Sequence, residues 1–239
     1  MANRKEHELF TLRKSDERGR IDHGWLEAKH TFSFGHYRDP DWMGFRSLRV
    51  INDDRIAPRM GFSEHGHRDM EIITYPLSGA IRHRDSLGNT EDITPGMIQR
   101  MTAGSGIRHS ESNPLDTETH LLQIWIEPRE LGLEPTHDSR VFSIAEETGK
   151  LHTLVSADGR DGSLVIQQDA AMSAGVFDAG ESISVAIRPG RHAWIHVVRG
   201  SVVIGGHPLV GGDSLGVSDS AGVQMEFDAE SEVLVFDLA

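Results

Sequence analysis

The stretch that decides the fold reads GFSEHGHRDMEIITY over residues 61–75, followed by PGMIQRMTAGSGIRHSESN over residues 95–113. Each segment holds two potential metal ligands that lie two positions apart: His65 and His67 in the first, His109 and Glu111 in the second. Residues i and i+2 of a β-strand point to the same face, about 6.6 Å apart at a rise of roughly 3.3 Å per residue. Both members of a pair can therefore reach one ion when the two strands face each other inside a barrel.

Three imidazoles and one carboxylate form a ligand set that suits a first-row transition metal, because calcium and magnesium prefer all-oxygen shells. The carboxylate has a second candidate in Glu71, four residues after His67. Four residues span about 13 Å along a straight strand, so Glu71 would need a bend in the backbone. Glu111 shares the face of His109 without a bend. The spacing therefore favours Glu111 beside the three histidines His65, His67 and His109.

Composition excludes several classes of protein. The chain has 239 residues, which is enough for one large domain or for two of about 120. Its formal net charge of −13 argues against direct binding of nucleic acid, which needs a basic face. Cysteine is absent, so disulfides, thiolate metal sites and cysteine nucleophiles are excluded. Apolar runs are far shorter than the roughly 18 residues of a membrane span, and the polar first 20 residues predict no secretory signal. We therefore expect a cytoplasmic protein that does not bind membranes.

Short apolar segments separated by turn residues predict an all-β protein. The chain contains 25 glycines, and its apolar segments are punctuated by turn signals, as in sandwiches and barrels. Candidate strands are residues 47–52, 70–77, 79–84, 97–102, 120–127, 163–168, 183–187, 193–199, 201–204 and 232–238. Helical periodicity is scarce, and we expect at most one or two helical turns, near residues 141–149.

A weak internal repeat predicts two similar β-barrels in tandem. A strand, Gly79, a second strand and a turn recur later around Gly200, an offset of 200 − 79 = 121 residues, about half the chain. Proline, glycine and polar residues interrupt the strand pattern between residues 128 and 160. We therefore predict a metal-binding domain over residues 1–130 and a second, metal-free domain over residues 131–239.

The second half lacks both ligand patterns. It contains His192, His196 and His207, but no His-x-His and no His-x-Glu pair. His196 lies in an otherwise apolar strand and is interpreted as a hydrogen-bonded structural histidine. The segment before the first barrel contains further histidines and aromatic residues, and we expect structural roles for both sets. The histidines, which could alternatively line the mouth of the metal cavity, are His23, His30 and His36. The aromatic residues, which could alternatively form a stacking wall for a flat substrate, are Trp25, Phe32, Phe34, Tyr37, Trp42 and Phe45.

The region 61–113 matches the two cupin motifs in order, and the chain as a whole resembles the pirin family. Matching segments extend well beyond the ligands and include HGWL (23–26), HTFSF (30–34), MGF (43–45), LRVINDD (48–54), MTAG (101–104), GI (106–107), HSE (109–111) and DGSL (161–164). The resemblance is strongest to the bacterial pirin-like quercetin 2,3-dioxygenases. It implies a bicupin fold, with two tandem antiparallel β-barrels of the jelly-roll type and a metal in the N-terminal barrel only.

The resemblance also implies an activity. It predicts a metal-dependent dioxygenase that opens the ring of a flavonol such as quercetin and releases carbon monoxide. The cofactor would be one divalent transition metal ion, with iron expected and nickel, copper, manganese, cobalt or zinc as alternatives, and no organic cofactor. The ligands would be His65, His67, His109 and Glu111, and Glu111 would also be the catalytic base for the substrate hydroxyl. The expected partners are a small planar polyphenol and dioxygen.

Two other functions remain open at this stage. Eukaryotic pirins are regarded as regulatory proteins, so the same ligands would also suit a non-enzymatic metal sensor that binds a protein partner according to its metal or redox state. The ligands are identical in both cases, and the sequence does not separate them. A metal-dependent sugar isomerase would need cationic groups inside the barrel, for which the motifs offer Arg68, Arg82, Arg100 and Arg108.

Overall fold

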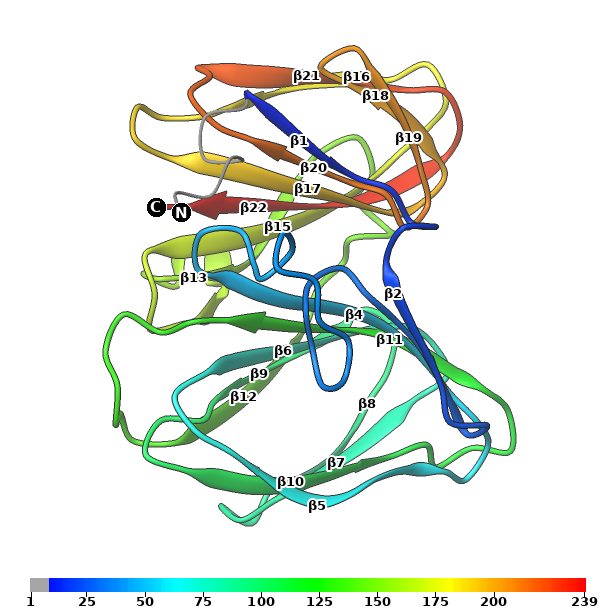
Figure 1. The fold of residues 1–239 in the computed structure, drawn as a ribbon, viewed down its shortest axis with the longest axis vertical. Coiled ribbons are helices and arrows are strands. Elements are labelled where there is room, and N and C mark those ends of the chain that lie inside the picture. The colour runs from blue at the N-terminus through cyan, green and yellow to red at the C-terminus, as the bar shows by residue number, and fades with distance from the viewer. Residues whose placement is uncertain (1–8) are drawn as a thin grey trace. The chain divides into compact units, whose positions relative to one another are not determined.

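The computed structural model describes residues 9–239, which form mostly β-strands (Figure 1). Contacts divide the chain into two compact units. The N-terminal unit comprises Gly19–Phe142 and Leu164–Gln168, and the C-terminal unit comprises residues 9–18, Ser143–Ser163 and Asp169–Ala239. The predicted division near residue 130 stays a prediction. Residues 1–8, the start of the polar stretch expected to lack a secretory signal, lie outside the described residues.

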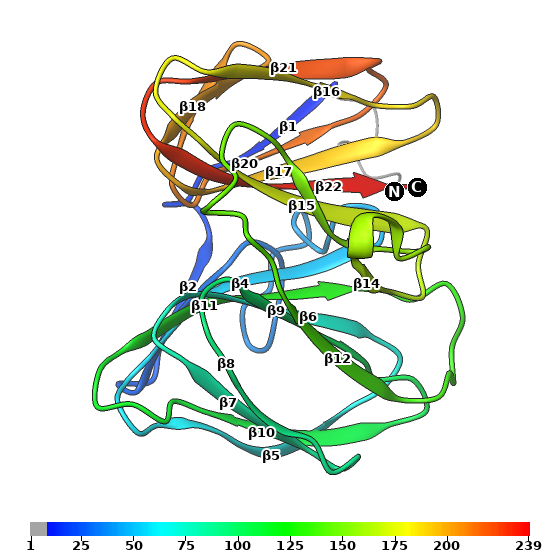
Figure 2. The same cartoon turned by 180° about the vertical axis from the view of Figure 1, so that it is seen from behind.

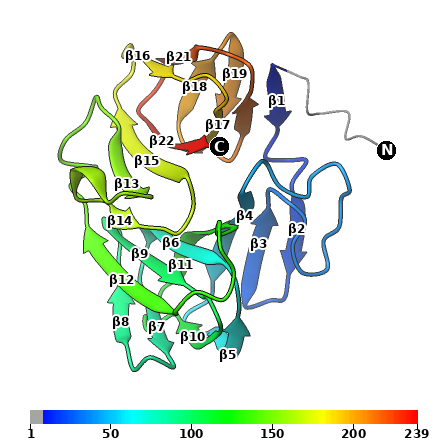
Figure 3. The same cartoon turned by 90° about the vertical axis from the view of Figure 1, so that its left-hand side faces the viewer.

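The N-terminal unit consists of two antiparallel sheets that face each other (Figures 1 and 3). Its strands are β2 (Gly19–Asp22), β3 (Leu26–His30), β4 (Leu48–Ile56), β5 (Gly61–His67), β6 (Glu71–Ser78), β7 (Ile81–Asp85), β8 (Thr90–Ile93), β9 (Met97–Thr102), β10 (Ile107–Ser112), β11 (Thr119–Ile126) and β12 (Thr136–Val141), and the returning segment contains the two-residue β14 (Leu164–Val165). The larger sheet has the order β12-β9-β6-β11-β4-β3-β2, and the smaller one has the order β5-β10-β7-β8.

Strand alternation sets what lies between these two sheets. On β7, every second side chain is buried, which turns Ile81, His83 and Asp85 inward. Ile81 belongs to an apolar cluster formed by both sheets, consisting of Leu26, Ala28, Ile56, Ile81, Ile93 and Leu121. Polar groups take the remaining inward positions of β7, and on β10 they take the inward positions that follow the buried Ile107. Buried polar groups need hydrogen-bonding or metal-binding partners. These inward polar side chains therefore mark the part of the interior where a functional site is expected.

The C-terminal unit repeats the same plan (Figure 2). Its strands are β1 (Phe10–Arg13), β13 (His152–Ser156), β15 (Ala170–Phe177), β16 (Ser182–Ala186), β17 (His192–Arg199), β18 (Ser201–Ile204), β19 (His207–Val210), β20 (Ser214–Val217), β21 (Gly222–Phe227) and β22 (Ser231–Leu238). The larger sheet contains β1-β20-β17-β22-β15-β13, and the smaller sheet has the order β16-β21-β18-β19. Strand for strand, β16 and β21 occupy the positions that β5 and β10 hold in the N-terminal unit.

The two glycines on which the repeat was predicted hold equivalent places. Gly79 connects β6 to β7 with φ +76°, and Gly200 connects β17 to β18 with φ +92°. In each unit a hydroxyl lies against the glycine and both donates to and accepts from the backbone of the next residue, at 2.8 and 3.2 Å for Thr119 and at 3.1 and 3.0 Å for Ser231. The all-β bicupin architecture predicted from the sequence is confirmed.

One element prediction needs correction and another is confirmed. Residues 163–168 contain only the two-residue β14. Residues 141–149 contain a single turn, in which Glu147 N donates to Ser143 O at 3.0 Å, as the prediction of at most one or two turns allows. The pattern missed β15, because its sequence AAMSAGVF is rich in small residues of low strand propensity, and burial between neighbours maintains this strand instead. Among residues 9–239, no helix is long and apolar enough to span a bilayer.

Candidate metal centre

Strand β10 places the predicted ligands because it pairs with β5 on one side and β7 on the other. His109 lies opposite His65 of β5 and Asp85 of β7, and Glu111 lies opposite His83. His109 and Glu111 are both buried and share the inward face of β10, as their two-residue spacing predicts. A β-bulge interrupts the β5–β10 ladder between these two residues, a feature frequent beside functional sites.

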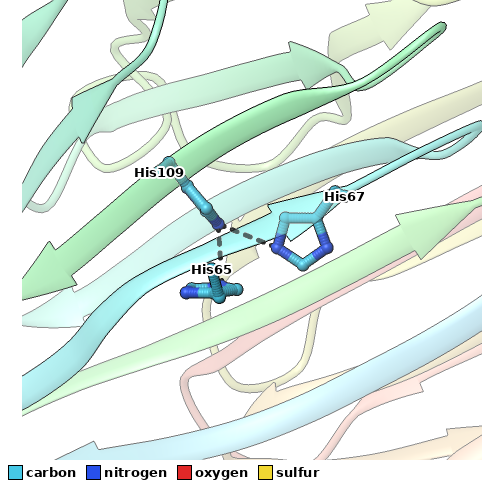
Figure 4. A group of neighbouring side chains, drawn as sticks. All are labelled: His65, His67 and His109. Atoms are coloured by element: carbon cyan, nitrogen blue, oxygen red, sulfur yellow. Dashed lines mark hydrogen bonds between the residues drawn. The ribbon is translucent and has the colours of Figure 1, made fainter.

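Three imidazole nitrogens converge at this point (Figure 4). The Nε2 atom of His109 lies 2.9 Å from Nε2 of His67 and 3.0 Å from Nε2 of His65. Nitrogen ligands bind a transition metal at about 2.0–2.1 Å, so two neighbouring ligands at a right angle are separated by about 3.0 Å. The spacing of these atoms therefore fits one coordination sphere.

The protonation of His67 and His109 also fits binding of a cation. Burial, followed by the neighbouring imidazoles, lowers the pKa of His67 to about 4 and the pKa of His109 to about 3, so both rings are neutral at pH 7. Nε2 of His109 can carry at most one hydrogen, yet it faces two other ring nitrogens. This nitrogen offers either one hydrogen or one lone pair, which serves one linear hydrogen bond and not two, whereas a metal ion accepts all three lone pairs.

Glu111 supplies a carboxylate beside these rings. Its side chain is buried, and Nε2 of Gln123 donates to both carboxylate oxygens, at 3.2 and 3.3 Å. One ligand atom each of Glu111, His109 and His83 lie within 4.8 Å of one another. Gln123 thus orients an acceptor that faces the histidine cluster.

The alternative carboxylate, Glu71, lies in a different environment. It is fully buried, and its Oε2 atom accepts a hydrogen bond from Thr102 Oγ1 at 2.9 Å. Burial raises the pKa of Glu71, and the Thr102 hydrogen bond and the charge of Arg100 oppose this rise. Glu71 does not line the cavity that contains the histidines.

The histidine cluster opens into a cavity of about 210 Å³, which is far more than one water molecule needs. Apolar side chains form much of its wall: Leu26, Phe34, Phe62, Ile72 and Trp125. The rings of Phe34 and Trp125 meet edge to face, with centroids 5.2 Å apart. His30, for which the sequence favoured a structural role and left the mouth of the cavity as the alternative, is buried and lines this cavity.

The polar part of the wall contains residues that the sequence interpretation missed. Asn52 and Asp54 lie on β4, and Gln123 lies on β11. Three polar atoms here are buried without a hydrogen-bond partner among the described residues: Asn52 Oδ1, Gln123 Oε1 and Trp125 Nε1. The available signal was the two-residue spacing of Asn52 and Asp54 on β4, and of Gln123 and Trp125 on the mostly apolar β11.

Asp54 is a neutral acid inside this cavity. Burial, followed by the charges of Asp53 and Glu111, raises the pKa of Asp54 to about 8. At neutral pH its carboxyl group therefore carries a proton and can donate a hydrogen bond. The neighbouring Asp53 pairs with His120, with 2.7 Å between Nε2 of His120 and Oδ1 of Asp53.

The C-terminal unit has no equivalent cluster among its described residues. The strands that correspond to β5 and β10 carry apolar side chains in the core, among them Ile183, Met225 and Phe227. His196 is buried, and its Nδ1 lies 2.8 Å from Ser214 Oγ, which confirms its interpretation as a hydrogen-bonded structural histidine. Within residues 9–239, all potential metal-binding groups lie between residues 65 and 137.

Comparison with known proteins places this architecture in a family. The sequence family described as Pirin matches residues 11–126, and the Quercetinase C-terminal cupin domain matches residues 153–238. A protein of Escherichia coli K12 named quercetin 2,3-dioxygenase is 47% identical over 231 residues, which cover 96% of this chain and 99% of that protein. The chain belongs to the pirin family.

Further relatives agree with this assignment. A pirin-like protein of Caulobacter vibrioides is 45% identical to this pirin over 192 residues, which cover 80% of this chain and 83% of that protein. The crystal structure of the E. coli bacterial pirin YhhW in complex with nickel(II) superimposes with a TM-score of 0.92 at 45% identity, covering 96% of this pirin and 98% of YhhW. A quercetin 2,3-dioxygenase of Acinetobacter baumannii, 19% identical with a TM-score of 0.78, shares the fold of this pirin and covers 96% of it, with 79% of its own chain matched.

Proposed function

We propose that this pirin is a metal-dependent dioxygenase that opens the ring of a flavonol such as quercetin and releases carbon monoxide. The observation that carries the proposal is the convergence of three imidazole nitrogens beside Glu111 in a cavity with an aromatic wall. The name of the E. coli relative at 47% identity supports the choice of substrate class. A small planar polyphenol and dioxygen are the proposed partners.

The proposed ligands of one divalent metal ion are His65, His67, His109 and Glu111. We propose iron as the resident metal, with copper, manganese, cobalt, zinc and nickel, the metal in the YhhW crystal structure, as alternatives. When bound, such an ion supplies a Lewis acid that lowers the pKa of a substrate hydroxyl and, for redox-active metals, an electron-transfer partner for dioxygen.

The side chains around the cavity are proposed to transfer the substrate proton and to bind the substrate. Glu111, oriented by Gln123, takes the hydroxyl proton as general base. The apolar wall with Phe34 and Trp125 accommodates a planar ring and excludes water. The unpartnered acceptor oxygen of Asn52 suits a phenolic hydroxyl, and the protonated Asp54 suits a carbonyl oxygen.

An assay with defined metals tests this function. The purified protein is stripped with a chelator, reloaded separately with iron(II), nickel(II), copper(II), manganese(II) or cobalt(II), and mixed with quercetin in air. We expect loss of the flavonol absorbance together with release of carbon monoxide. Unchanged absorbance with every metal would contradict the enzyme and favour the non-enzymatic regulatory role.

Two matched carboxylate variants test the role of Glu111. Glu111→Gln should lower turnover by at least about 100-fold, because the amide cannot accept the substrate proton and general-base catalysis contributes about 10²–10⁴-fold. Glu71→Gln keeps a buried polar group outside the cavity and should retain most of the turnover. Thermal unfolding checks that both variants fold. Full activity of Glu111→Gln would refute its role as base.

A further inference from the structure

A buried chain of hydrogen bonds reaches the back of His109 from strand β7. His83 and Asp85 are both buried on the inward face of this strand. Nε2 of His83 lies 3.0 Å from Oδ2 of Asp85, and Nδ1 of His83 lies 3.3 Å from Nδ1 of His109. The opposite nitrogen of His109, Nε2, is the atom that meets His65 and His67.

The direction of each hydrogen bond follows from Asp85. Its carboxylate accepts hydrogen bonds from Leu87 N at 2.9 Å, Asn89 N at 3.0 Å and Asn89 Nδ2 at 2.9 Å. A carboxyl group surrounded by donors acts as an ionised acceptor, so Nε2 of His83 carries a hydrogen. In a neutral His83 ring, Nδ1 is then an acceptor, and His109 donates its Nδ1 hydrogen to it.

With its hydrogen on Nδ1, His109 has no hydrogen on Nε2, and the lone pair of Nε2 faces His65 and His67. His65 reaches the same tautomer by a different route, because its Nδ1 lies 2.8 Å from the carbonyl oxygen of Ser63. We propose that His83 and Asp85 are positioning residues that hold His109 in its metal-binding tautomer and make its Nε2 a stronger donor. The inference rests on the metal centre of the proposed function, and it adds two residues that do not touch the metal or substrate.

A second metal ion bound by His83, Asp85 and His137 is the rival interpretation, since single ligand atoms of these residues lie within 4.8 Å of one another. The imidazoles of His83 and His137 are stacked, with centroids 4.9 Å apart and planes inclined by 24°. Lone pairs in the planes of stacked rings run side by side and do not converge on one ion. Asp85 already accepts several hydrogen bonds. The hydrogen-bond chain from Asp85 through His83 to His109, called the relay below, is therefore the better account.

The tautomer of His109 tests the relay without any metal or flavonol. Two-bond ¹⁵N–¹H correlation spectra of the metal-free protein, labelled at histidine nitrogens and recorded where the rings are neutral, identify which nitrogen carries the hydrogen. We expect Nδ1–H for His109 in the parent protein. His83→Leu removes the acceptor and should shift His109 towards Nε2–H, whereas His83→Asn offers an amide oxygen near the position of Nδ1 and should retain the parent tautomer. An Nε2–H form of His109 in the parent would overturn the proposal.

Metal affinity provides the second measurement. Competition with a chelator gives the nickel(II) affinity, and we expect His83→Leu to weaken it about 10- to 100-fold and His83→Asn to recover part of the loss, as found for residues that orient metal ligands. His137→Phe keeps the stacked ring and is the matched control, with unchanged affinity and one ion per chain. Parent-like affinity in His83→Leu, or two ions in the parent and one in His137→Phe, would overturn the proposal. Neither measurement uses quercetin, so an inactive flavonol assay would refute the proposed substrate and leave the relay standing.

Discussion

The interior of the N-terminal unit changes the protonation of one residue, Asp54. Its carboxyl group lines the same cavity as Glu111, which is proposed to be the anionic ligand. Burial, followed by the charges of Asp53 and Glu111, raises the pKa of Asp54 to about 8, so its carboxyl group keeps a proton at neutral pH. A neutral acid can donate to a substrate oxygen, which an ionised Asp54 would repel.

This raised pKa predicts a pH-dependent stability of the metal-free protein. Between the ordinary pKa of 3.8 and the folded-state pKa of about 8, the folded state retains a proton that the unfolded state loses. The contribution of Asp54 to the free energy of unfolding therefore falls as the pH rises through this range, and its loss is complete above about pH 8. In Asp54→Asn this titration is absent. The stability of the variant relative to the parent should thus increase with pH, by up to about 1.4 kcal/mol per pH unit.

Urea denaturation of the chelator-treated parent and Asp54→Asn at about pH 5, 7 and 9 measures this difference. The other charged groups around the site, including Asp53 and Glu111, are the same in both proteins, so their titration largely cancels. Equal pH dependence of the two unfolding free energies would show that Asp54 ionises normally.

Strand β10 is the element on which the site depends. Its hydrogen bonds to β5 and β7 bring the nitrogens of histidines that are 42 and 44 residues apart in the sequence within 3.0 Å of each other. The period of two turns His109 and Glu111 inward together, and the same rule turns His83 and Asp85 inward on β7. Local periodicity thus predicts the facing of a side chain, and the strand pairing decides which side chains meet.

The connection between β6 and β7 provides a stability prediction at this scale. Gly79 has φ +76°, and an added Cβ would lie 2.7 Å from Thr119 Oγ1. Gly88 is the matched control, because its φ is +95° and an added Cβ would meet nothing within 4 Å. Both Ala variants bear the backbone strain of roughly 1–3 kcal/mol, but Gly79→Ala must also displace the buried hydroxyl. Chemical denaturation should show a clearly larger loss of stability for Gly79→Ala, and equal losses would contradict this role of the Thr119 contact.

Two strands of the C-terminal unit show where the strand pattern succeeds and where it fails. Strand β17 was found as residues 193–199, and the structure has His192–Arg199. Strand β15 was missed, because small residues give little local preference and its place is set by pairing with β13 and β22. A local sequence pattern contains no information on long-range hydrogen bonding, so it does not predict a strand that depends on pairing.

At the scale of the whole molecule, the two units share the order of their strands but differ in the side chains that fill their interiors. The repeat is visible in the equivalent positions of Gly79 and Gly200, yet the C-terminal unit fills its interior with apolar side chains. One unit therefore keeps a cavity with polar groups, and the other has a continuous core. We expect one metal ion per chain.

Two histidine variants test this single site. His196→Ala removes a buried ring and the partner of Ser214, so it should destabilise the protein by roughly 1–3 kcal/mol and leave the metal content unchanged. His67→Ala removes one of the three convergent nitrogens and should strongly reduce the metal content. Elemental analysis after reconstitution compares them with the parent. A metal content that falls equally in both would contradict a site confined to the N-terminal unit.

The sequence by itself determined the all-β class, the two repeated units and the inward facing of the two predicted ligand pairs. These features follow from local rules, because a strand alternates its side chains whatever it pairs with. Only the tertiary structure decided which distant residues surround the pairs. Asp54, Gln123 and the chain from Asp85 through His83 reach the site from three other strands. Their meeting depends on sheet register and on the packing of two sheets, which are set by contacts between residues far apart in the chain.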